Sequence, residues 1–196
     1  MNRIHRLLIR FSSQRLLAVL ALLFFPLILS VNLLDMPISL PRMKALTGGH
    51  TILDMVPFYT AEKAYQMLTA YGPAGRQHYL RILFSVDIVL PILAASFLAV
   101  AMTMVFPAGH SLRKLNVAPV LALLADYLEN AAVLALLLYY PNHLDGVASV
   151  AGVITLAKHG FYWGSALLVL YGLVLAALRT RPGSRALARR SNRQSE

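Results

Sequence analysis

Several charged side chains lie inside long apolar stretches of this sequence. Asp126 and Glu129 occur in one such stretch, and Lys158 occurs in the next. Placing a charged side chain at the centre of a bilayer costs about 2.5–3.5 kcal/mol on insertion scales. Charged side chains in such positions either pair with one another or serve a binding site, a proton path or acid–base chemistry.

Helical geometry predicts that Glu129 and Lys158 meet. Each lies roughly 15 Å from the same end of its stretch, at a rise of about 1.5 Å per residue. Asp126, Glu129 and Asn130 share one helix face because they are three or four residues apart. One interpretation is a buried ion pair between Lys158 and Glu129 that only fixes the register of two helices. The other is a polar pocket, since three acids, Asp87 included, outnumber the lysine.

We predict a buried polar site for ligand binding, built from acids, one lysine and nearby polar or aromatic side chains. Its predicted members are Asp35, Asp87, Asp126, Glu129, Asn130, Lys158, His159, Tyr162 and Trp163. The sequence contains no catalytic-triad order, phosphate loop or dinucleotide fingerprint, so no catalytic residue is assigned and the sequence does not decide whether the protein is an enzyme. It has no cysteine and no Glu-x-x-His pair, and we expect no metal site and no cofactor.

Four apolar stretches carry these residues, and they span approximately 16–34, 82–106, 117–140 and 147–178. About 20 apolar residues are enough to cross the hydrocarbon core of a bilayer as a helix. Only 13% of the chain is charged, against about 25% in soluble domains. We therefore predict an all-α fold, a four-transmembrane-helix bundle that forms a single integral membrane domain over residues 1–196. A signal peptide is the alternative for the first stretch, but its apolar core is long and no small-x-small cleavage site follows it.

The segment between the first two stretches, residues 35–81, is predicted to lie outside the cell and to contain short amphipathic helices. Thr60 suits the N-cap of a helix over 60–71. Gly72 suits the residue after that helix, and Pro73 suits the start of another, which should continue directly into the second stretch. The Pro- and Gly-rich piece over 37–57 is predicted to be an ordered cap or a re-entrant loop.

The distribution of basic residues predicts the orientation. The loop over 107–116 contains Arg113 and Lys114, whereas the loop over 141–146 contains no Lys or Arg. The positive-inside rule then places both termini, including the basic tail over 179–196, on the cytoplasmic side of the inner (plasma) membrane. The net charge of +10 reflects arginines that flank apolar stretches and attract anionic lipids, so we expect no nucleic-acid binding.

Two resemblances accompany these patterns. The run from Tyr71 to Arg81, with Asp87 and the run from Asp126 to Asn130, resembles a pattern in uncharacterised bacterial four-helix membrane proteins. The runs 33–36 and 84–91 are similar to acid-bearing positions of the EXPERA group, which includes the emopamil-binding sterol isomerase and the sigma-2 receptor. The second resemblance implies a closed bundle around a lipid-accessible pocket, with Asp35 and Asp87 near its polar end. We do not transfer isomerase activity to this chain.

Three functions are compatible with these features. The favoured one is a polytopic membrane protein whose buried polar site binds a hydrophobic or amphipathic, lipid-like ligand. The second is an accessory or assembly subunit of a larger membrane complex, in which the buried charges pair with a partner chain. The third is proton-coupled transport, which would require a homo-oligomer because the chain has no inverted repeat. The expected partners under the favoured function are membrane lipids. Under the two alternatives, the partner is another protein or a second copy of this chain.

Overall fold

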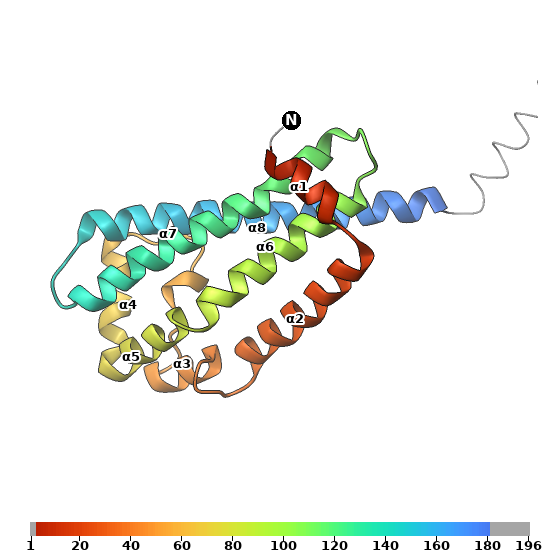
Figure 1. Cartoon of the computed structure of the whole chain (residues 1–196). Coiled ribbons are helices and arrows are strands. Elements are labelled where there is room, and N and C mark those ends of the chain that lie inside the picture. The colour runs from red at the N-terminus through yellow and green to blue at the C-terminus, as the bar shows by residue number, and fades with distance from the viewer. Residues whose placement is uncertain (1–2, 181–196) are drawn as a thin grey trace, which may run out of the picture.

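The computed structural model describes residues 3–180, and this part of the chain is helical apart from its connecting loops (Figure 1). The elements are α1 (Arg3–Phe11), α2 (Gln14–Leu33), α3 (Leu40–Thr47), η1 (Leu53–Met55), α4 (Ala61–Ala70), α5 (Gly72–Leu83), α6 (Val86–Val105), η2 (Ser111–Val117), α7 (Ala118–Tyr139) and α8 (Asp145–Thr180). The predicted basic tail over 179–196 lies outside the described residues, except for the backbone of the last two residues of α8.

Four helices, α2, α6, α7 and α8, are long and apolar enough to cross a membrane. The predicted all-α class and the predicted number of long apolar helices are therefore confirmed. The 36 residues of α8 correspond to about 54 Å, well beyond the roughly 30 Å of a hydrocarbon core. The last helix is thus overlong, as its sequence indicates.

The long helices pack unevenly. The most extensive contact between two helices is that of α7 with α8, and α6 packs against α2, α7 and α8. Within the described residues, α2 rests on α6 and α3 but forms no extended contact with α8 (Figure 1). Among the long helices, α2 is therefore attached mainly to α6.

Short helices occupy the two ends of the bundle (Figure 1). One end holds α3, η1, α4 and α5, which we call the cap, and the other holds α1 and η2. Thr60 caps α4 by accepting a hydrogen bond from the Lys63 amide at 3.2 Å, as predicted. Gly72 follows the end of α4 and has a positive φ of 60°, and it is already the first residue of α5.

The predicted continuation of α5 into the second apolar helix is wrong, because α5 ends at Leu83 and α6 begins at Val86 rather than at residue 82. The Ser85 hydroxyl donates to the Arg81 carbonyl at 2.5 Å. Such a side-chain bond to the backbone competes with helix continuation.

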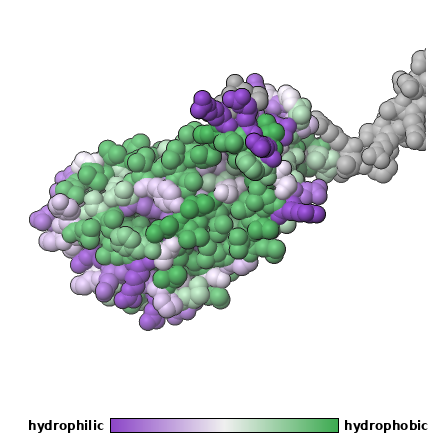
Figure 2. Space-filling view, in the orientation of Figure 1, coloured by the Kyte–Doolittle hydropathy of each residue, from purple (hydrophilic) through white to green (hydrophobic). Residues whose placement is uncertain are grey.

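The surface of the long helices is strongly apolar. Hydrophobic side chains cover their sides, and hydrophilic ones gather towards the two ends (Figure 2). Leu22, Leu33 and Trp163 are among the large apolar residues that are more than half exposed. Soluble monomers seldom expose a contiguous apolar surface of this kind.

Candidate functional site

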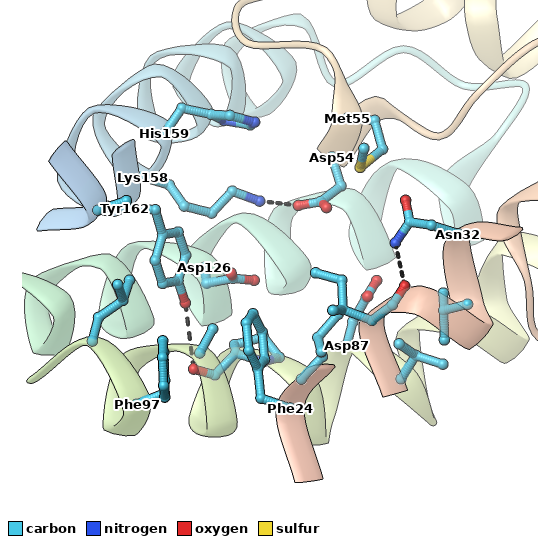
Figure 3. A pocket seen from close by; sticks show the side chains of 18 of the residues that line it. Phe24, Asn32, Asp54, Met55, Asp87, Phe97, Asp126, Lys158, His159 and Tyr162 are labelled. Atoms are coloured by element: carbon cyan, nitrogen blue, oxygen red, sulfur yellow. Dashed lines mark hydrogen bonds and ion pairs between the residues drawn. The ribbon is translucent and has the colours of Figure 1, made fainter. Parts of the chain in front are cut away.

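A cavity of about 500 Å³ lies between α2, α6 and α8, beside the loop that contains η1 (Figure 3). Its lining is mostly apolar, and its polar residues lie in the half nearer the cap. The polar lining residues are Asn32, Asp54, Asp87, Asp126, Lys158, His159 and Tyr162. The apolar lining far from the cap includes Ala94, Phe97, Leu98, Ala166 and Val169. The cavity thus has the shape and polarity that suit a molecule with a polar head and an apolar tail.

Lys158 stands at the centre of a buried ion network. Its Nζ pairs with Glu129 Oε2 of α7 at 2.5 Å and also with Asp54 Oδ1 from the η1 loop. Figure 3 shows the Lys158 and Asp54 side chains pointing toward one another at the polar end of the cavity. The Glu129 side chain is 0% exposed, and its other oxygen accepts from Thr155 Oγ1 at 2.6 Å. The predicted meeting of Glu129 and Lys158 is confirmed, although Glu129 stands behind the cavity wall instead of lining it.

Asp54 was not predicted as a site residue. It lies in a loop, 104 positions before Lys158, and helix periodicity cannot relate a loop residue to a helix face. The available signal was local: Asp54 is an acid within the otherwise apolar run 52–56. An acid in such a run has to find a partner when the run becomes buried.

Two buried tyrosines hold the η1 loop in place. Tyr79 Oη accepts from the Asp54 amide at 3.2 Å, and Tyr71 Oη donates to the Thr51 carbonyl at 2.8 Å. Their rings pack edge to face, with centroids 6.0 Å apart. Burial raises the pKa of both phenols above the ordinary value, so both stay neutral hydrogen-bonding groups at neutral pH. The cap therefore fixes the backbone that carries Asp54.

Gly152 allows the same loop to approach α8 closely. A Cβ at this position would overlap the carbonyl oxygen of Tyr59. We expect Gly152→Ala to lower the free energy of unfolding by about 1–3 kcal/mol, the usual range for overpacking. Thermal unfolding in detergent would measure it.

Gly160, on the same helix, is the matched control for this substitution. It has open space around the corresponding Cβ, so Gly160→Ala should stabilise the helix by about 0.5–1 kcal/mol. Equal effects of the two substitutions would contradict the assigned role of Gly152.

Asp87 and Asp126 line the cavity without a cationic partner among the described residues. Asp87 is only 8% exposed, and its Oδ2 is buried without a hydrogen-bond partner. Asp126 Oδ1 accepts from Asn130 Nδ2 at a long 3.4 Å. Buried carboxyl oxygens normally have partners, so Asp87, which lines the cavity, retains unused hydrogen-bonding capacity at Oδ2.

Asn130 acts on the backbone of α6 and does not line the cavity. Pro91 has no N–H group, so the carbonyl of Asp87 four residues earlier lacks its helical partner. Asn130 Nδ2 donates to that carbonyl at 3.2 Å, and Tyr162 Oη donates to the Pro91 carbonyl at 3.4 Å. Side chains of α7 and α8 thus fix the part of α6 that presents Asp87.

The remaining predicted residues divide into two groups. His159 and Trp163 line the cavity, and Trp163 is 67% exposed at its edge. Asp35 does not line this cavity, so its predicted place near the polar end of the pocket is wrong. It lies in the connection between α2 and α3, where its exposed side chain faces Arg42 at 3.7 Å in a second cavity.

No protein-family model matches this chain, and no significant match was found among curated proteins or solved structures. The two resemblances therefore remain predictions, and the function has to be argued from the cavity itself.

Proposed function

We propose that this chain is a multi-pass membrane protein that binds a lipid-like, amphipathic molecule in the cavity between α2, α6 and α8. Two observations support the membrane placement: four helices have the necessary length and apolarity, and their sides expose large apolar residues. In this placement the arginine-rich α1 and the η2 loop face the cytoplasm, as the positive-inside rule favours.

The observation that carries the binding proposal is the pair of acids, Asp87 and Asp126, in a cavity whose far end is apolar. Lys158 is already engaged by Asp54 and Glu129, so it does not neutralise these two acids. A ligand head that donates hydrogen bonds, such as a hydroxyl or an amine, would satisfy them. An apolar tail would then extend along Ala94 and Ala166.

The separation of α2 from α8 supplies an entrance for such a ligand. Phe25 of α2 and Trp163 of α8 both line the cavity, and both are substantially exposed. Apolar side chains at an opening suit a path through lipid better than a path through water. We therefore propose that the ligand enters sideways from the bilayer.

The test is the ligand content of the protein purified in mild detergent, measured by native mass spectrometry. We expect a bound amphiphile in the wild type and about tenfold lower occupancy in Asp87→Asn, because a hydrogen bond to a charged group contributes about 1.5–3 kcal/mol. Asparagine retains the shape of the side chain but removes its negative charge.

Asp145→Asn is the matched control, because Asp145 is an exposed acid of α8 outside the cavity. Its occupancy should equal that of the wild type. A wild type that carries no amphiphile, or that purifies with a stoichiometric partner chain over these acids, would overturn the binding proposal and favour an accessory subunit.

A further inference from the structure

A second cavity, of about 340 Å³, lies in the cap, between α3, α5 and the connection from α2 to α3. It is separate from the first cavity and differs from it in being lined mainly by polar and basic groups. Its charged and polar lining residues are Asp35, Arg42, Gln77, His78 and Arg81. Hydrophilic side chains gather at this end of the molecule (Figure 2).

Two arginines give this second cavity its positive charge. Arg42 faces Asp35 at 3.7 Å, but both side chains are more than half exposed, so this pair contributes little to stability. Arg81 is also exposed, and no ion pair engages it within the described part of the chain. Two guanidinium groups against one carboxylate leave a net positive charge at the cavity.

A hydrogen-bonded contact of His78 joins the helices that line the second cavity. His78 is almost fully buried, and its Nε2 lies 3.0 Å from the Ser39 carbonyl oxygen. This contact joins α5 to the residue that caps α3, since Ser39 Oγ accepts from the Arg42 amide at 3.3 Å. The helices that carry Arg42 and Arg81 are thereby held beside each other, and both arginines line the same cavity.

We propose that this cavity binds a phosphate group between Arg42 and Arg81. The planar, permanently charged guanidinium matches phosphate oxygens in a two-pronged geometry, and two of them on one cavity provide more donors than a single surface arginine. The phosphate can belong to a lipid headgroup or can be a free phosphate ion.

The surroundings favour the lipid headgroup. Leu33, Leu34 and Phe84 are strongly exposed apolar residues at the adjoining ends of α2 and α5. The choice of a lipid as the source of the phosphate rests on the membrane placement proposed above. In that placement, the second cavity lies where the apolar surface of the long helices meets the polar cap. Phosphates of bilayer lipids occupy that level.

The test measures binding to the full-length protein in detergent, with two probes. One is phosphatidylglycerol, detected by native mass spectrometry, and the other is inorganic phosphate, added as a competitor. We expect the double substitution R42Q/R81Q to weaken phosphatidylglycerol binding by about tenfold or more, because charge-assisted hydrogen bonds are lost. Asp35→Asn should strengthen binding, because it removes the carboxylate that competes for Arg42.

Lys44→Gln is the matched control, because Lys44 is an exposed cation of the same short helix and does not line the second cavity. Binding should be unchanged in this variant. Competition by inorganic phosphate identifies the phosphate group as the recognised element, and binding of inorganic phosphate without phosphatidylglycerol identifies a free ion as the ligand.

Two results would overturn the phosphate site. One is unchanged binding in R42Q/R81Q, and the other is an equal loss in Lys44→Gln, which would indicate general charge attraction. Neither result bears on the amphiphile cavity, whose acids lie on other elements and are tested by Asp87→Asn.

Discussion

Replacement of Lys158 by methionine should lower the free energy of unfolding by about 3–5 kcal/mol, the usual cost of removing one partner from a buried ion pair. Methionine keeps an unbranched side chain but leaves the carboxylates of Glu129 and Asp54 without their shared cation. Glu129 suffers most, because its side chain is fully buried. Thermal unfolding in detergent and the yield of monodisperse protein would measure the loss.

Two further variants separate charge from packing in this prediction. Lys44→Met removes an exposed lysine of α3 and should leave the unfolding temperature unchanged. Adding Glu129→Gln to Lys158→Met should recover part of the loss, because the amide no longer carries a buried charge. If Lys158→Met unfolds at the wild-type temperature, Lys158 does not neutralise these acids.

Ala166→Phe should abolish amphiphile binding while the protein stays folded. Ala166 lines the apolar part of the cavity on α8, and a phenyl ring there would occupy the space proposed for the tail. The ring enters an existing cavity of about 500 Å³, so it should not incur the strain that enlarging a packed core residue causes. We expect at least a tenfold fall in ligand occupancy by native mass spectrometry, with an unchanged or higher unfolding temperature.

Ala157→Phe is the corresponding control, since Ala157 is an exposed residue of α8 outside the cavity. It should retain the ligand at wild-type occupancy. Together with Asp87→Asn, the pair separates head from tail: Asp87→Asn changes the affinity for the polar head, and Ala166→Phe removes the volume. Retention of the ligand in Ala166→Phe would place the binding site elsewhere.

The long helices and the Glu129–Lys158 contact could be predicted because both depend on regular geometry. An apolar run fixes the approximate ends of a helix, and a constant rise per residue then gives the depth of each side chain. The loop between α7 and α8 is short, so both depths can be counted from one reference level. That is enough to bring Glu129 and Lys158 together.

The loop residues could not be placed by the same reasoning. Asp54 reaches Lys158 only because Tyr71, Tyr79 and Gly152 position the η1 loop against α8. Asp35 follows the end of α2 in the connection to α3, where its side chain faces Arg42 of α3 and does not line the first cavity. Such placements arise from tertiary contacts among distant segments, and no periodicity in the sequence encodes them.

The attachment of α2 along one side only has a consequence for how the proposed ligand is selected. A molecule that enters between α2 and α8 arrives by diffusion in two dimensions, and its mole fraction in the bilayer, rather than its solubility in water, determines how often the cavity is filled. Modest intrinsic affinity is then sufficient for high occupancy. The abundant competitors are ordinary phospholipids with equally apolar tails, so discrimination has to come from the few polar contacts at Asp87 and Asp126.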